Sequence, residues 1–129
     1  PVFGWRCDDF PAFWRRSSGL RLDQRFDDIA QLAEAIRMHY TLGTGTGVIV
    51  ANPVPEASEL DEDSYERALN GALEMVESQG IRGREVTPYI LDYMQMVTGG
   101  EVTAPNVALL KDNARVAGEL AVALAAARG

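Results

Sequence analysis

The run VIVA at residues 48–51, followed directly by Asn52 and Pro53, decides the fold class of this 129-residue chain. A short apolar, β-branched run is typical of a strand buried on both faces, as in a parallel sheet beneath helices. The run VFGW at residues 2–5 predicts an earlier strand, and an amphipathic helix over 27–40 separates the two runs. This alternation of strand and helix predicts an α/β layer structure.

Outward from these strands, apolar spacing predicts helices over about 62–79, 88–97 and 104–127 and a short half-buried strand around residues 20–22. Thr87 and Pro88 are typical of an N-cap and first helical residue. The last helix is expected to bury a stripe of small and medium side chains, namely Leu110, Ala114, Ala117, Ala121 and Leu124. About three strands would leave a sheet edge bare, so we expect the back half of a larger sheet domain.

Composition limits the classes of function. The hydrophobic content of 47% suits one domain with a sizeable core, whereas a net charge of −7 argues against binding to a nucleic acid polymer. No membrane span is expected, because charged residues interrupt the most apolar stretch, 107–127. The single cysteine, Cys7, indicates a reducing compartment such as the cytoplasm, and one Cys with one His cannot form a zinc site of Cys/His type.

Three segments hold candidate residues for contact with a polar ligand. Arg16, Ser17 and Ser18 lie in a loop whose guanidinium and hydroxyl groups suit a phosphate, although a solvated basic loop is the simpler interpretation. Asn52 follows a strand at the end where α/β proteins bind ligands, although Asn-Pro is also a common turn. Thr87 lies where a helix begins, and the dipole there favours anions.

Asn106 and Asn113 are seven residues apart, so they share one face of the last predicted helix. Asn106 lies in the first turn, where it could orient a polar ligand or stabilise negative charge, although a hydrogen-bonded structural amide is an equal alternative. A structural role is favoured for Asn113. Lys111, the only lysine, points about 140° away from Asn106, which makes joint action on one ligand unfavourable.

Several segments together resemble one family, the pseudouridine-5′-phosphate glycosidases, also called indigoidine synthase A-like proteins. The family segments FPAF(Y)…RSSG, VVVANPIPE, GIxGKxxTP and TGG…NIALxxNNA are similar, in this order, to FPAFWRRSSG (10–19), VIVANPVPE (48–56), GIRGREVTP (80–88), TGG (98–100) and NVALLKDNA (106–114). The resemblance extends over essentially all 129 residues. It implies an α/β/α sandwich with three layers, of which residues 1–129 would form the C-terminal part, with the N-terminal part absent.

The resemblance also implies an activity, namely cleavage of the C–C glycosidic bond of pseudouridine 5′-phosphate to uracil and ribose 5-phosphate. The family uses a lysine Schiff base, a divalent metal, usually Mn²⁺, and commonly a homotrimer. The lysine and the metal ligand belong to a segment upstream of the one that matches Pro1, so we expect both outside this chain. Asn106 matches the family's active-site asparagine near uracil, whereas Asp112 replaces an asparagine.

Two alternatives stay open. The first is a homologous enzyme that acts on another phosphorylated C-glycoside. The second is a catalytically inactive binding or assembly module. A lysine-bearing region upstream of Pro1 would favour an enzyme, and a natural start near Pro1 would favour the module.

Overall fold

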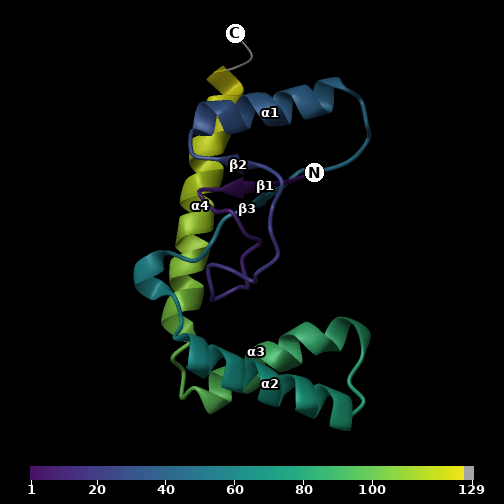
Figure 1. Cartoon of the computed structure of the whole chain (residues 1–129), viewed down its shortest axis with the longest axis vertical. Helices are drawn as coiled ribbons and strands as arrows, with labels where there is room; N and C mark the ends of the chain where they lie inside the picture. Colours follow the sequence, from purple (N-terminus) through teal and green to yellow (C-terminus); the bar gives the residue numbers. More distant parts are fainter. Residues whose placement is uncertain (127–129) are drawn as a thin grey trace.

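A computed structural model of the chain describes residues 1–126 (Figure 1). A small sheet and two helices form one end of the molecule, and a helical hairpin forms the other. In chain order, the elements are β1 (Val2–Trp5), β2 (Arg25–Phe26), α1 (Ile29–Thr41), β3 (Ile49–Ala51), the 3₁₀ turn η1 (Glu56–Ser58), α2 (Glu62–Ser78), the 3₁₀ turn η2 (Gly83–Glu85), α3 (Val86–Val97) and α4 (Thr103–Ala126).

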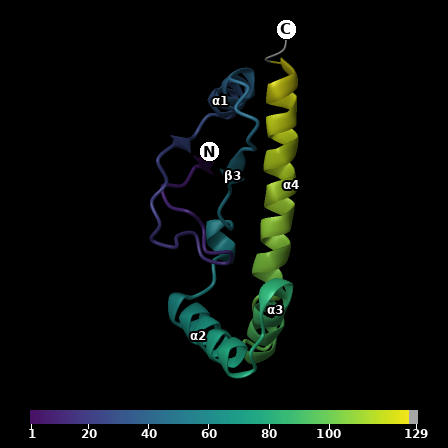
Figure 2. The same ribbon diagram turned by 90° about the vertical axis from the view of Figure 1, so that its right-hand side faces the viewer.

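The sheet has the order β2-β1-β3, and both strand pairs are parallel. Helix α1 connects β2 to β3, as a parallel pairing requires. Helices α1 and α4 lie on one face of the sheet, and the loop over residues 6–24 lies on the other (Figure 2). At Gly4 in the central strand, a Cβ atom would collide with the Cys7 carbonyl oxygen, so this loop packs directly on β1. The α/β class predicted from the sequence is confirmed.

Alternate residues of β1 form the core beneath α1 and α4. Phe3 and Trp5 are buried against Leu32 and Ile36 of α1 and Val116 of α4. Helix α1 begins after an Asp28 cap and ends at Thr41, close to the expected 27–40. Burial of large apolar side chains at about 1.5–3 kcal/mol each holds these elements together.

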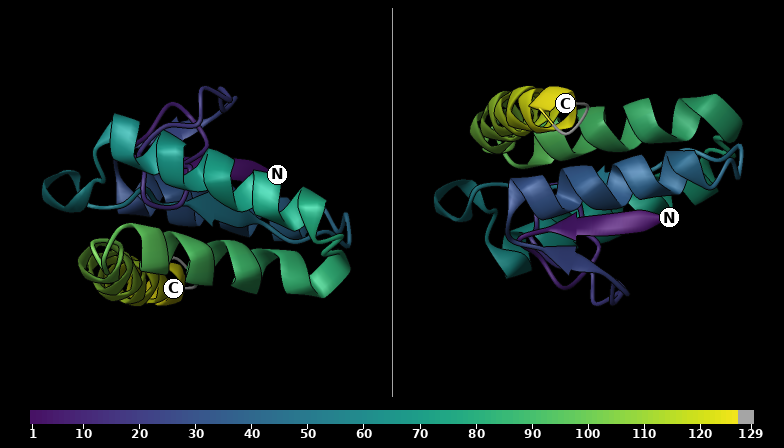
Figure 3. Two further views of the ribbon diagram at one scale, coloured as in Figure 1. Left: turned by 90° about the horizontal axis from the view of Figure 1, so that it is seen from below. Right: turned by 90° about the horizontal axis from the view of Figure 1, so that it is seen from above.

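Helices α2 and α3 lie side by side at the far end of the molecule (Figure 3). They form a second core, separate from that of the sheet, whose buried members are Trp14, Leu60, Ala68, Ala72, Met94 and Val102. Gly80 closes the C-terminus of α2, because it adopts a φ of 66° and the Ile81 N–H donates to the Val76 carbonyl, 3.0 Å away. Residues 1–126 therefore carry two apolar cores, which α4 connects.

Two strand predictions are wrong in part. Residues 20–22 form no strand, and the second strand lies at Arg25–Phe26 instead. Leu20 and Arg21 are exposed, and their stretch pairs only within the loop, through an antiparallel bridge between Asp9 and Arg21, and not with the sheet. The expected burial of 48–51 on both faces is also wrong, because Ile49 is 55% exposed. β3 lies at an edge of this sheet, and the loop over 6–24 covers the neighbouring Ala51 but leaves Ile49 uncovered.

The predicted buried stripe of the last helix is wrong as well. Leu110 is 61% exposed, and Ala114, Ala117 and Ala121 are exposed too. The buried face of α4 carries Leu109 and Val116 instead. Each lies one residue before a position predicted to be buried, which places it about 100° around the helix from that position. Leu124 alone of the predicted set packs, partly buried, against the sheet core. The predicted end of this helix at residue 127 lies outside the described residues.

Candidate functional site

The carboxyl end of β3 is tied to α4 by one side chain. Asn52 Nδ2 donates to Asp112 Oδ2 and to Asn113 Oδ1, at 2.9 Å in both cases. Pro53 prevents the strand from continuing, so Asn52 turns out of the sheet toward α4. Both amide hydrogens of Asn52 are thereby used, and this side chain retains only its carbonyl oxygen for a ligand.

Asp112 is the charged centre of this contact. Arg115 donates to Asp112 Oδ1 from Nε at 3.0 Å and from Nη2 at 2.7 Å. Burial alone would raise the pKa of Asp112, but the hydrogen bonds from Asn52 and Arg115 outweigh burial and hold that pKa below its usual range. The carboxylate that replaces the family's asparagine at position 112 is therefore paired by a charge on the next turn of the same helix.

A hollow of about 260 Å³ opens beside this contact. Its polar lining comes from Asn52 and Asn113, and its apolar lining comes from Val50, Val116, Ala117 and Leu120. The Asn52 carbonyl oxygen and the Asn113 N–H groups are not used in the contact between the two amides, so the hollow offers one acceptor and paired donors. Such a set suits a planar ligand that carries amide groups.

Asn106 lies in the first turn of α4 and is half-buried. Its backbone N–H donates to the Val102 carbonyl at 3.1 Å, and within residues 1–126 its side-chain amide has no hydrogen-bond partner. Asn113, two turns later on the same face, accepts from Asn52. The two asparagines therefore differ as the sequence suggested they might: Asn113 is engaged structurally, and the Asn106 amide is available.

The loop candidates are committed to contacts within the chain. Arg16 Nη1 donates to the Val54 carbonyl at 2.7 Å, Ser17 Oγ donates to Asp9 Oδ2 at 2.6 Å, and Ser18 Oγ donates to the Phe10 carbonyl at 2.6 Å. The Arg16 contact holds the loop against the segment that follows β3, and the two serine contacts hold the loop against its own earlier residues. In this arrangement the two hydroxyls have no free proton for a phosphate.

Thr87 does not cap α3. The helix begins at Val86, its N-cap is Glu85, and no side chain caps it, because the 3₁₀ turn Gly83–Glu85 runs directly into the helix. Thr87 is an exposed residue of the first turn and lies on the helical hairpin, apart from the contact between Asn52 and α4. The structure thus brings Asn52 and Asn113 together and leaves Thr87 elsewhere.

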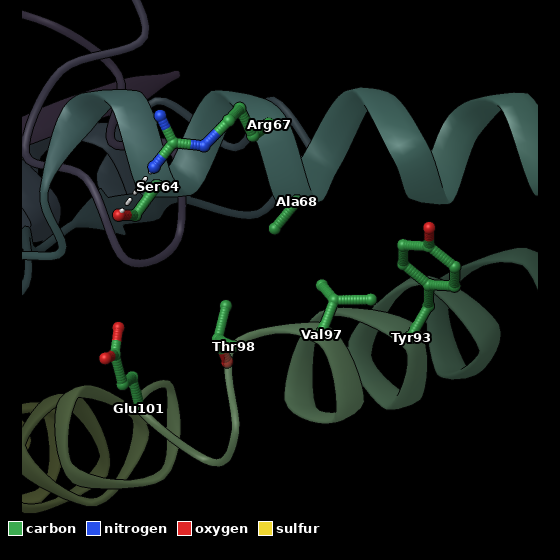
Figure 4. Close-up of a pocket in the computed structure, with 7 residues that line it drawn as sticks. All are labelled: Ser64, Arg67, Ala68, Tyr93, Val97, Thr98 and Glu101. Atoms are coloured by element: carbon green, nitrogen blue, oxygen red, sulfur yellow. Dashed lines mark hydrogen bonds between the residues drawn. The ribbon is translucent and has the colours of Figure 1, made fainter.

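A second hollow, of about 270 Å³, lies between α2 and the link from α3 to α4 (Figure 4). Arg67 donates to Ser64 Oγ at 3.3 Å across its upper wall, and Glu101 lies on the opposite wall. Thr98, the first residue of the TGG segment, lines it, but none of the candidate ligand-binding residues does. At the Asn52 contact, the sequence analysis names Asp112 but not its partner Arg115, and their spacing of three residues is the signal that could have found the pair.

Neither a metal site nor a membrane-spanning helix is found in the described part of the chain. No three His, Cys, Asp or Glu side chains of residues 1–126 are placed to hold a metal ion together. Within the same residues, every helix is too short or too polar to cross a membrane. Lys111 is exposed on α4.

Comparison with curated proteins finds close relatives. The chain is 42% identical over 125 residues to pseudouridine-5′-phosphate glycosidase 2 of Rhizobium johnstonii. The matched residues make up 97% of this chain and 40% of the relative. It is 40% identical over 124 residues to the pseudouridine-5′-phosphate glycosidase of Caldanaerobacter subterraneus subsp. tengcongensis, again over 40% of the relative. The chain therefore spans about 40% of the length of these relatives.

Solved structures agree with this relationship. A prealnumycin C-glycosynthase in complex with ribulose 5-phosphate superposes with a TM-score of 0.85 at 33% identity, over 99% of this chain and 42% of that structure. An indigoidine synthase A-like protein of Thermotoga maritima superposes with a TM-score of 0.81 at 35% identity, over 96% of this chain and 40% of that structure. Residues 1–123 match the family described as indigoidine synthase A like protein, and the chain belongs to that family.

Proposed function

We propose that the protein formed with this chain cleaves the C–C glycosidic bond of pseudouridine 5′-phosphate, giving uracil and ribose 5-phosphate. The observation that carries the proposal is the match of 97% of the chain, at 42% identity, to a curated glycosidase of that name. Residues 1–129 would form the C-terminal region of the single catalytic domain, because the relatives are covered over only 40% of their length.

Within this region, Asn106 is the residue proposed to contact the uracil base. Its half-buried amide is free of partners among residues 1–126 and offers both a donor and an acceptor. Uracil has amide groups that match this pair, and hydrogen bonds that strengthen as the base departs would lower the barrier. Arg16, Ser17, Ser18, Asn52 and Thr87 stay weaker candidates, and their role would be to order the loops around the substrate.

The covalent step belongs to residues outside this chain. A lysine amine joined to C1 of the opened sugar turns that carbon into a Schiff base as uracil leaves, and water then releases the sugar. Lys111 does not suit this role, because it is exposed and points about 140° away from Asn106 around α4. Manganese would likewise need ligands from outside residues 1–126, which hold no cluster of three metal-binding side chains. We further propose that the complete protein is a homotrimer in the cytoplasm.

One observation favours a second activity. The C-glycosynthase that superposes at a TM-score of 0.85 is described in complex with ribulose 5-phosphate, a phosphorylated sugar. The second candidate is therefore a homologous enzyme that acts on another phosphorylated C-glycoside. A catalytically inactive binding module is the remaining alternative.

The test joins this chain to the part of the Rhizobium relative that it does not cover, about 60% of that protein. The fusion is incubated with pseudouridine 5′-phosphate and Mn²⁺, and free uracil is measured by chromatography. We expect uracil from the fusion and none from the 129-residue chain alone. Asn106→Ala should lower the rate about 100-fold, the usual cost of one lost donor to a reacting group.

The matched control is Lys111→Ala on the same helix, which should leave the rate unchanged. Uracil release by the isolated chain, or loss of activity in Lys111→Ala, would contradict the proposed roles. If the folded fusion releases no uracil but joins ribose 5-phosphate to an aromatic acceptor, detected by mass spectrometry, the second activity is the correct one. A folded fusion inactive in both assays would indicate the binding module.

A further inference from the structure

Four arginines converge on one hollow beyond the carboxyl end of β1. The hollow measures about 300 Å³, and its charged lining consists of Arg6, Arg16, Arg21, Arg25, Asp8 and Asp9. We call it the arginine pocket. The charges of the lining residues sum to +2, and Asp27, which pairs with Arg25 at 2.8 Å, reduces the sum to +1, on a chain whose net charge is −7. The pocket is therefore a local positive site on an acidic protein, at the end of a parallel strand where α/β proteins place their ligands.

Arg6 is held in the pocket without an ion pair. Its guanidinium carbon lies 4.6 Å from the ring centroid of Trp5, and Trp5 is only 2% exposed. Among residues 1–126, no carboxylate lies within 4.0 Å of Arg6. Its φ of 55° is in the left-handed region, which costs a non-glycine residue about 1 kcal/mol or more. A strained backbone thus orients an arginine that has no counter-charge in contact with it.

The other three arginines differ in how firmly they are paired. Arg25 is fully engaged, with Asp8 at 2.9 Å and Asp27 at 2.8 Å, and Arg16 is anchored on the Val54 carbonyl. Arg21 makes only long contacts of 3.8 Å with Asp8 and Asp9, and its side chain is 75% exposed. Contacts of this length between exposed groups contribute little, so Arg21 can turn to an incoming anion at small cost.

We propose that the arginine pocket binds a single phosphate group, either as inorganic phosphate or as the phosphate of a small phosphomonoester. Arg6 and Arg21 supply the charge-assisted hydrogen bonds, and Arg25 with its two carboxylates forms the fixed wall. The acidic remainder of the chain disfavours a long polyanion such as a nucleic acid. This inference is independent of the proposed catalysis, because none of these arginines is assigned a part in bond cleavage.

The experiment is a titration of the 129-residue chain by isothermal calorimetry at constant ionic strength, with inorganic phosphate, ribose 5-phosphate, ribose and chloride as separate ligands. We expect phosphate and ribose 5-phosphate to bind with one site, and ribose and chloride to give no binding. The double variant Arg6→Gln/Arg21→Gln should bind phosphate more weakly by at least about tenfold, which is 1.4 kcal/mol.

The matched control is Arg82→Gln/Arg84→Gln, which removes the same charge from the exposed turn before α3. It should bind phosphate as the unaltered chain does. Absence of phosphate binding, or equal weakening in both double variants, would overturn the proposal. So would binding of ribose 5-phosphate without inorganic phosphate, because that result would show recognition of the sugar.

Far-UV circular dichroism establishes that each variant is folded. If Arg6→Gln/Arg21→Gln does not fold, Arg21→Gln alone, at a 75% exposed side chain, provides the same comparison. Because no uracil assay is involved, failure of this proposal leaves the proposed glycosidase activity untouched, and the reverse also holds.

Discussion

Replacing Asn52 by alanine should destabilise the protein by about 2 kcal/mol. The change removes two hydrogen bonds from β3 to α4, one to the Asp112 carboxylate and one to the Asn113 amide. A neutral hydrogen bond contributes about 1 kcal/mol and one to a charged group about 1.5–3 kcal/mol. These sum to about 2.5–4 kcal/mol. Asn113 is exposed and regains water, and Asp112 keeps Arg115, so the net loss falls somewhat below this sum.

For 129 residues, an unfolding entropy of about 2.1 cal/mol/K per residue converts 2 kcal/mol into a fall of about 7 °C in Tm. The measurement is thermal and urea unfolding followed by circular dichroism. Asn106→Ala is the matched control, because Asn106 shares a face of α4 with Asn113 but its amide makes no hydrogen bond within residues 1–126. The stability of this variant should differ from that of the unaltered chain by no more than about 0.5 kcal/mol. A loss below about 0.5 kcal/mol for Asn52→Ala, or equal losses for both variants, would refute the reasoning.

The effect of Asn52→Ala should also depend on pH. The pKa of Asp112 is lowered in the folded protein, so the stability that its charge supplies is present above the unfolded pKa of about 3.9 and is lost as pH falls through the folded value. The difference in unfolding free energy between the unaltered chain and Asn52→Ala should therefore be constant from neutral pH down to about pH 5 and shrink in more acidic solution. A difference that grows on acidification would show that the Asp112 charge does not stabilise the contact.

Three further expectations concern the two cores and the lone thiol. Met94→Ala removes a side chain that is 2% exposed between α2 and α3, and urea unfolding should show a loss of about 2–5 kcal/mol; a loss under 1 kcal/mol would mean that the hairpin core closes over the cavity. Gly4→Ala places a Cβ against the Cys7 carbonyl oxygen, and urea unfolding should show a stability loss of about 1–3 kcal/mol. An unchanged unfolding midpoint would show that the loop over 6–24 shifts freely. Burial raises the pKa of the Cys7 thiol, so alkylation by iodoacetamide at pH 7.5 should be much slower in the native chain than in urea, and equal rates would place Cys7 at the surface.

Helices could be predicted well because each carries its own signal. Asp28 and Asp61 cap α1 and α2, and Gly80 ends α2 with the expected left-handed conformation. These signals act within one or two turns of chain and need no knowledge of the remaining fold. The start of α3 was misplaced because a 3₁₀ turn supplied the first turn that a capping Thr87 would otherwise have provided.

Strands and buried faces depend on partners far away in the chain, and here the sequence was less informative. The alternation at Leu20 and Leu22 resembles a strand, yet pairing with β1 falls on Arg25–Phe26. In α4, both the face with Leu109 and the face with Leu110 are apolar, so periodicity alone could not decide between them. Asn52 is predicted to contact a ligand from its place at a strand end, and this stays a prediction; its partners on α4, 60 and 61 residues away, lie beyond local reasoning.

The two separate cores have a consequence for the order of folding. The hairpin of α2 and α3 joins residues adjacent in sequence, whereas β1 must find β3 across the span from Val2 to Ile49. Local contacts form sooner because less chain entropy is lost in closing them, so the hairpin is the natural nucleus and the parallel sheet the slower step. Each core also holds one tryptophan, Trp5 in the sheet core and Trp14 in the hairpin core. Because Trp14 comes from the loop over 6–24, its fluorescence would report the docking of that loop on the hairpin, a long-range step that follows formation of the hairpin itself.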